Sequence, residues 1–122
     1  MQENENAVKL CDTVLEYVPE FRNYKDFSVW GDNGKSAPYS HFGVFGRFIV
    51  EQIENFPDTA DVTKRIFDFI NDAYNNSEDP YIHTMVGTEI LENLTVSEKM
   101  RAVAKKYLRN GVLEHFMKTL NS

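Results

Sequence analysis

The chain has 122 residues, of which 42% are hydrophobic and 13% aromatic, a composition typical of one globular domain and unlike that of a disordered segment. The formal net charge is −6 and the pI is near 5.0, so the average surface repels nucleic-acid phosphates and favours a basic partner. Residues 1–94 contain seventeen acids and seven bases, whereas residues 95–122 contain two acids and six bases. An acidic body therefore precedes a basic C-terminal segment.

Cys11 is the only cysteine, so the chain cannot form an internal disulfide, and its apolar neighbours predict a small core residue. The acidic segment 1–6 lacks the basic and apolar regions of a signal peptide. No apolar run approaches the roughly 20 residues that span a bilayer. These features predict a cytoplasmic protein without a membrane partner.

The first helix is expected from Asn6 to Val18, where apolar residues recur at helical spacing and Pro19 ends the run. Residues 20–27 suit a short helix that turns back onto the core. The pattern fails over residues 28–38, which contain turn formers and Trp30. Asn33-Gly34 suits a primed turn, which leaves open one very short β-hairpin here. Irregular segments of this length are often functional.

A second helix is expected over residues 40–56, closed by Pro57. Gly43 and Gly46 lie inside it and cost helix stability, which predicts the close approach of another backbone. Val44 and Phe48 point away from the main apolar stripe. Either another helix covers these two side chains or they are exposed anchors.

The most regular apolar stripes lie in residues 58–94 and predict two antiparallel helices. Asp79 suits the N-cap of the second helix and Pro80 its first position. A fifth helix follows, for which Thr95 and Glu98 have capping-box spacing. Asn110-Gly111 suits a left-handed cap before a short closing helix over residues 112–120.

Candidate catalytic and metal-binding groups are scattered. The three histidines, His41, His83 and His115, lack the paired spacing of a zinc site, so we expect surface histidines and no metal or other cofactor. Glu89 falls inside an apolar arc, which predicts a raised pKa and a structural ion pair with Arg65 or a place at the edge of the core. A catalytic role for Glu89 would need a second polar group, and none can be named.

A basic run on the fifth helix could contact RNA, but it lacks interleaved surface aromatic residues, and we interpret it as a hydrated helix face. The expected partners therefore include no nucleic acid. The run comprises Arg101, Lys105, Lys106 and Arg109.

Acidic side chains share one flank of the third helix and continue into the following loop; they are Asp61, Asp68, Asp72, Glu78 and Asp79. Arg65 lies among them and is expected to neutralise part of their field, so an ordinary hydrated face is one interpretation. The other is a docking surface that imitates phosphates, occupies the cationic active site of a nuclease and hastens association.

Several phrases of the sequence resemble small helical bacterial immunity proteins of polymorphic toxin and contact-dependent growth inhibition systems. They are Pro19-Glu20-Phe21, Pro38-Tyr39 with Phe42-Gly43, Phe45 and Phe48, and the segments 65–70, 90–94 and 104–108. The resemblance implies a cytoplasmic protein that binds one cognate toxin domain, often a nuclease, and blocks it. It transfers no binding residue.

We therefore predict an all-α single domain over residues 1–122, with five to seven helices, that neutralises a toxin by binding and without catalysis. The predicted contacts combine the aromatic anchors Trp30 and Phe48 with carboxylates, since large aromatic residues carry interface energy and charges set association rate. The carboxylates are Asp32, Glu51, Asp68 and Asp72. The alternatives are an acidic adaptor or regulatory domain without a toxin partner, and an enzyme that uses Glu89.

Overall fold

Two antiparallel helices, α1 (Glu5–Tyr17) and α3 (Asp61–Asn75), lie side by side in the computed structural model, which describes residues 4–122. At one end, Nη1 of Arg65 donates a hydrogen bond to the carbonyl oxygen of Tyr17 at 2.9 Å. At the other end, the side chains of Asn4 and Asn6 donate to Oδ2 of Asp79 at 3.1 and 2.9 Å. The pair is therefore fixed at both ends.

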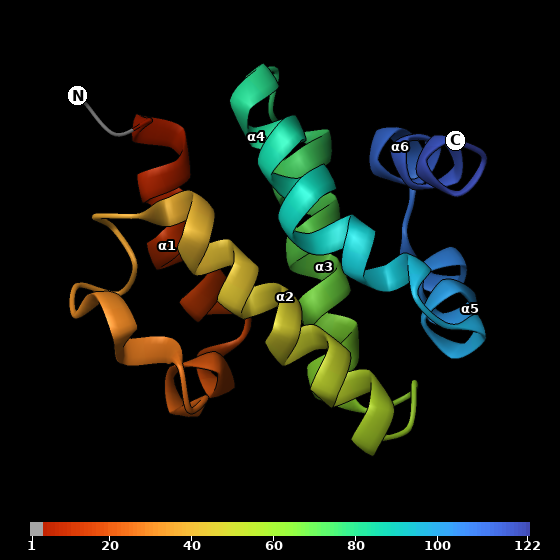
Figure 1. The fold of residues 1–122 in the computed structure, drawn as a ribbon, viewed down its shortest axis with the longest axis horizontal. Coiled ribbons are helices and arrows are strands. Elements are labelled where there is room, and N and C mark those ends of the chain that lie inside the picture. Colours follow the sequence, from red (N-terminus) through yellow and green to blue (C-terminus); the bar gives the residue numbers. More distant parts are fainter. Residues whose placement is uncertain (1–3) are drawn as a thin grey trace.

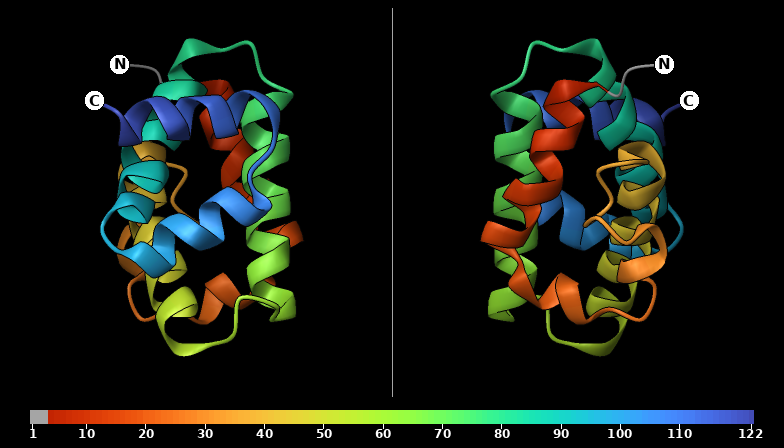
Figure 2. Two further views of the ribbon diagram at one scale, coloured as in Figure 1. Left: turned by 90° about the vertical axis from the view of Figure 1, so that its right-hand side faces the viewer. Right: turned by 90° about the vertical axis from the view of Figure 1, so that its left-hand side faces the viewer.

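The described residues contain six α-helices and no strand, so the prediction of a single all-α domain is confirmed. Figure 2 shows α1 and α3 in one layer and α2 in a second, while α5 and α6 lie on the side away from α1 (Figure 1). After α1 the order is η1 (Pro19–Asn23), η2 (Phe27–Trp30), α2 (Pro38–Asn55), α3, α4 (Pro80–Met85), η3 (Val86–Ile90), η4 (Leu91–Thr95), α5 (Glu98–Tyr107) and α6 (Asn110–Leu120).

Aromatic rings fill the centre between the two layers. Phe42 of α2 stacks on Phe69 of α3 with ring centroids 6.0 Å apart, and Phe45 meets Phe69 edge-on at 5.6 Å. Phe21 of η1 packs on Phe45 at 4.9 Å. Such offset and edge contacts add to the free energy of burial, so the turn after α1 is joined to the common core.

The very short β-hairpin that the sequence leaves open in residues 28–38 does not form. Asn33 and Gly34 do adopt positive φ angles of 60° and 85°, as a primed turn requires. Their flanks, however, are the 3-10 turn η2 and the first turn of α2, so no strands are available to pair. A Cβ at Gly34 would overlap the ring of His41, which explains why this tight turn carries glycine.

The second half of the central hairpin is not one regular α-helix. Asp79 caps α4 by accepting from the amide of Tyr81, and Pro80 is its first residue, as predicted. After Met85, however, the backbone widens into the π-helical turn η3 and then tightens into η4. The side chain of Asn93 donates to the carbonyl oxygen of Glu89 at 2.7 Å and satisfies a group that a continuous helix would pair.

The close backbone approach expected at the α2 glycines is confirmed at Gly46. A Cβ there would overlap the carbonyl oxygen of Glu89, and the amide nitrogen of the Asn93 side chain would lie 2.6 Å away. At Gly43 the nearest atom would be Oε2 of the Glu89 side chain, at 2.9 Å. The π-helical turn is thus pressed against α2 where α2 has no side chain.

Two predicted helix ends differ from the structure. Ser97, not Thr95, caps α5 by accepting from the amide of Met100, while the hydroxyl of Thr95 donates to the carbonyl of Glu92. α5 ends at Tyr107, and the left-handed Asn110, with φ 57°, is the first residue of α6 and not a cap of α5.

Asparagine side chains of α3 hold the turn between α5 and α6. Asn71 donates to the carbonyl of Tyr107 and accepts from the amide of Arg109, at 3.0 and 2.9 Å. Asn75 donates to the carbonyl of Arg109 and accepts from the amide of Val112, at 2.9 and 3.0 Å. Long-range side-chain bonds therefore replace a local glycine cap.

His41 is fully buried, so the expectation of a surface histidine is wrong at this position. Its ring lies among Phe21, Phe27 and Trp30, with centroid separations of 5.2 to 6.1 Å, and neither ring nitrogen has a hydrogen-bond partner among the described residues. Burial lowers the pKa of His41 to about 4, and the charge of Asp32 opposes this shift.

We expect Gly46→Ala to lower the free energy of unfolding by about 2 kcal/mol, because the added methyl group meets fixed backbone. Gly43→Ala is the matched control in the same helix, since the Glu89 carboxylate can turn aside. Its effect should stay within about 1 kcal/mol because alanine also favours helix. Urea unfolding of both variants measures the difference, and equal losses would contradict the packing at Gly46.

His41 should make stability depend on pH. Its pKa is about 4 in the folded protein against 6.5 as the ordinary value, so the unfolded chain binds the extra proton between these values. The contribution of neutral His41 is complete above pH 6.5 and is lost as the pH falls to 4, by about 3 kcal/mol. His41→Leu should flatten the unfolding free energy over this range, and a parallel pH profile for both proteins would contradict the assignment.

Candidate functional site

A groove of about 490 Å³ runs along the outer seam between α1 and α3 and is closed at one end by the start of α4. Its floor is apolar and includes Leu10, Phe69, Ala73 and Ile82. The α1 wall is built from residues 6, 9, 10, 13 and 17, and the α3 wall from residues 69, 72, 73 and 76. Both sets recur at steps of three and four, so each wall is one face of a helix.

The rim of the groove is acidic. Asp72 lies on the α3 side, and Glu78 and Asp79 lie in the loop at the closed end. Among the described residues that line the groove, Lys9 is the one base. An apolar floor with a negative rim is complementary to a partner segment that carries apolar residues beside lysine or arginine.

Asp72 and Asp68 differ in their surroundings although both are exposed. The hydroxyl of Tyr17 donates a hydrogen bond to Asp72 across the groove, and this bond raises the pKa of Tyr17 to about 12. The side chain of Asp68 makes no hydrogen bond or ion pair with another residue in the range 4–122. Asp68 is therefore the less engaged of the two carboxylates.

Asp79 is held more firmly. It accepts from Asn4, Asn6 and the amide of Tyr81, and these donors lower the pKa of its carboxyl group. Asp79 therefore stays ionised at the closed end of the groove over a wide range of pH. Its first function is structural, because it joins the start of α1 to the start of α4.

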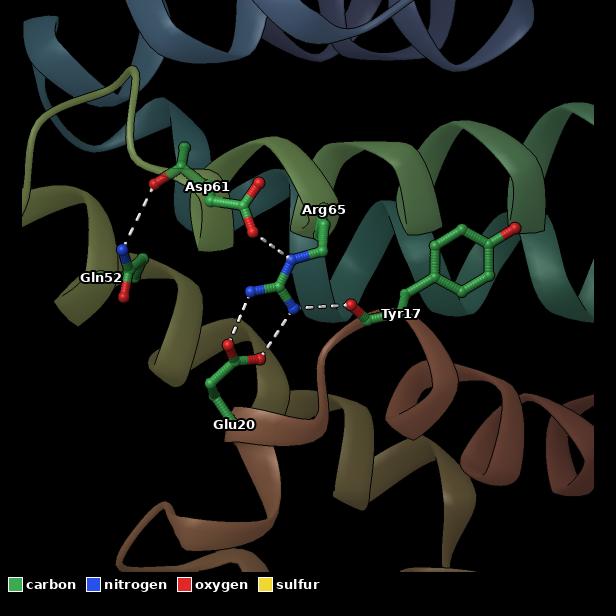
Figure 3. A network of polar contacts seen from close by, with 6 residues as sticks. Tyr17, Glu20, Gln52, Asp61 and Arg65 are labelled. Carbon is green, nitrogen blue, oxygen red and sulfur yellow. Dashed lines mark hydrogen bonds and ion pairs between the residues drawn. The ribbon is translucent and has the colours of Figure 1, made fainter.

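Arg65 does not neutralise the acidic flank as broadly as its position in the sequence suggests. Its guanidinium group turns away from Asp68 and forms two bonds with Glu20, at 2.8 and 2.6 Å, and one with Asp61, at 2.8 Å (Figure 3). These bonds lower the pKa of Glu20. Arg65 thus compensates Asp61, and the nearest base to Asp68 along α3 is the exposed Lys64, one helical turn earlier.

Of the two alternatives predicted for Glu89, the ion pair with Arg65 does not form, because Arg65 binds Glu20 and Asp61. Glu89 instead lies against Gly43 of α2. Burial raises the pKa of Glu89, as predicted, and the charge of Arg47 opposes the shift.

The six residues predicted to bind a partner do not form one surface. Asp72 lines the groove and Asp68 lies one helical turn earlier, whereas none of the other four lines the groove. Trp30 is half-buried against His41, and Asp32 is exposed and accepts a bond from Ser36 at 3.4 Å.

Phe48 and Glu51 of α2 are also partly engaged. Phe48 is half-buried against Phe21 and Tyr24, at 5.4 and 5.5 Å. Glu51 accepts a bond from the hydroxyl of Tyr24 and lies 3.9 Å from Lys25. Val44, the other candidate for an exposed apolar residue, is only 2% exposed. This side of the molecule therefore offers less free aromatic surface than the sequence suggests.

The structure brings together two histidines that are distant in sequence. The ring of Tyr74 stacks on His83 at 4.1 Å, and its hydroxyl lies 2.7 Å from Nδ1 of His115. Nε2 of His83 lies 2.7 Å from the carbonyl oxygen of Ser77, so this ring secures the end of α3. No cluster of three metal-ligating side chains occurs within residues 4–122.

Sequence reasoning identified the acidic rim of the groove but missed its apolar floor and its α1 wall. Leu10 and Ala73 fit the apolar periodicity that predicts core-facing stripes, and Tyr17 lies near the end of the first predicted helix. The signal that could have found them is the width of the apolar arc: both helices carry apolar residues beyond the buried stripe, next to small or polar neighbours.

The fold defines a small all-α domain, and a comparison with known protein families gives its family. The chain belongs to the family described as "Domain of unknown function (DUF7674)", whose model matches residues 11–121. No curated protein and no solved structure has significant similarity to it. No helix of the described residues is long and apolar enough to cross a membrane.

Cys11 should be unreactive in the folded protein. It is fully buried, and burial with the nearby charge of Asp12 raises its pKa to about 12, so almost no thiolate forms. We expect Ellman's reagent at about pH 8 to label it only as fast as the protein opens, and at once in guanidinium chloride. Cys11→Ser gives the background, and rapid labelling of the native chain would contradict the burial.

Proposed function

We propose that this protein is a stoichiometric inhibitor of the immunity type, which binds a basic toxin domain and acts without catalysis in the cytoplasm. The observation that carries the proposal is the groove between α1 and α3, where an apolar floor is bordered by Asp72, Glu78 and Asp79. Together with Asp68, these carboxylates form a surface that attracts a positively charged protein.

The commitment of Arg65 to Glu20 and Asp61 strengthens the proposal. Asp68 and Asp72 form no ion pair within residues 4–122, and together with Glu78 and Asp79 they leave an excess of negative charge beside Lys9 and Lys64. Opposite potentials of this kind hasten the encounter of two proteins and suppress partners with the same sign of charge. A nuclease that binds phosphates would present the required positive potential at its active site, and covering that site would block the enzyme.

The side chains whose chemistry could suggest catalysis are instead part of the packing of the domain. Cys11 is buried with a pKa of about 12, and His41 is enclosed by aromatic rings with a pKa of about 4. Glu89 supports the packing of η3 against α2. These surroundings favour binding over an enzymatic role.

An adaptor or regulatory domain without a toxin partner is the alternative, because the same groove would serve it. The gene context separates the two: a large secreted protein with a variable C-terminal domain encoded next to this chain favours immunity. Co-expression with that C-terminal domain tests the proposal directly. Rescue of growth and a co-purifying complex are expected, and toxicity that persists without a complex would overturn it.

The double variant Asp68→Lys/Asp72→Lys should slow association with the toxin domain by about tenfold or more and reduce its salt dependence, since steering depends on opposite charge. Stopped-flow measurements at several ionic strengths provide the test. Glu54→Lys changes an exposed acid on α2 and is the control for net charge. Asp72→Asn, which can still accept from Tyr17, separates the loss of charge from the loss of that bond. An unchanged rate would remove the acidic flank from the interface.

A further inference from the structure

The shape of the groove specifies the form of its occupant. Its α1 wall extends from Asn6 to Tyr17, and at 1.5 Å per residue this corresponds to about 17 Å, or three turns of an α-helix. At the Tyr17 end the Tyr17 hydroxyl bonds to Asp72 across the groove, so an occupant lies over that bond. The wall is straight because it follows a single helix, and α3 runs antiparallel beside it. A partner element that fills the groove must therefore be straight and of similar length.

We infer that the groove between α1 and α3 binds an amphipathic α-helix of about three turns, with lysine or arginine on one flank, supplied by a partner protein. This inference rests on the proposed function and specifies its partner. The docked helix would complete a three-helix layer with α1 and α3.

A helix fits the walls better than an extended segment. Peptides bind as strands by adding to a sheet edge, and residues 4–122 contain no strand. The walls instead present ridges at steps of three and four, which interdigitate with the ridges of another helix. Ala73 lies on the floor between Phe69 and Ile82, and its small side chain lets the docked helix approach closely.

The charge of the rim determines which flank of the occupant is basic. Asp72 lies on the α3 side, and Glu78 and Asp79 lie at the closed end, whereas Lys9 lies on the α1 side. The basic residues of the docked helix are therefore expected toward α3. An acidic helix would meet like charges at the same positions.

The basic helix α5 of a second copy does not meet these requirements. Its apolar residues Met100, Val103 and Ala104 are buried in the core of its own domain, so they cannot enter a groove on another copy. Lys106 is also bound to Asp58 at 2.9 Å. α5 of a second copy is therefore excluded as the occupant.

The test uses a synthetic peptide of about fourteen residues, with leucine at helical spacing, lysine along one flank and alanine elsewhere, since this length gives the three to four turns required. Two peptides of matched length serve as controls. One carries glutamate in place of lysine, and the other has the same apolar residues but two central prolines that prevent a helix. Fluorescence anisotropy measures affinity, and amide chemical shifts locate the site.

We expect the lysine peptide to bind with shifts confined to α1, α3 and the loop before α4, and both control peptides to bind at least about tenfold more weakly. Ala73→Arg should weaken the lysine peptide by a similar factor, because it fills the floor with a like charge. Asp72→Asn should weaken it by several-fold with little change in fold. Glu54→Lys should leave binding within about twofold.

Equal binding of the proline peptide would overturn the helical occupant, and shifts outside the groove or no binding would overturn the site. A failed peptide test does not decide the toxin assay. If the toxin domain forms a complex although no peptide binds, the protein is still an inhibitor but uses another contact surface. Conversely, peptide binding in the groove together with a failed rescue by every neighbouring toxin domain would retain the site and reject the inhibitor.

Discussion

The guanidinium group of Arg65 is the contact on which both the pairing of α1 with α3 and the charge along the outer flank of α3 depend. It joins three segments, since it binds Glu20 of η1, Asp61 of its own helix and the carbonyl of Tyr17 at the end of α1 (Figure 3). Lysine could not replace these bonds, because they use the forked donors of arginine. Arg65 is 29% exposed in its side chain, so the network is screened only in part by solvent.

The inward turn of Arg65 also has an electrostatic consequence. Asp68 and Asp72 lie three and seven positions further along α3, on the same flank. An outward Arg65 would reach the first of them and reduce the field at the second. Because the Glu20 carboxylate of η1 binds the Arg65 guanidinium group, the arginine side chain is held near the start of α3 and away from Asp72. The bonds of Arg65 that secure α1 thus also keep its positive charge away from Asp68 and Asp72.

The parts of this fold that could be predicted are those fixed by local sequence. Prolines and apolar periodicity placed α1 and α2 within two residues of their observed ends, and Asp79-Pro80 marked the start of α4. The parts that could not be predicted depend on distant residues. The π-helical turn follows from the contact of Gly46 with Glu89, and the turn before α6 follows from Asn71 and Asn75. His41 has no local signal that separates a buried ring from an exposed one.

The groove combines both kinds of feature, and this explains why its rim could be predicted but its floor could not. Carboxylates on one helical flank are visible in a single segment, whereas a floor exists only where two segments meet. Ile66, Phe69 and Ile70 anchor α3 in the core, and bonds at both ends hold α1 against it. The groove is therefore formed before a partner arrives. Binding to a preformed groove requires little free energy to order its walls. The affinity of a docked helix therefore depends mainly on how helical that segment is before binding and on how well it matches the floor and rim.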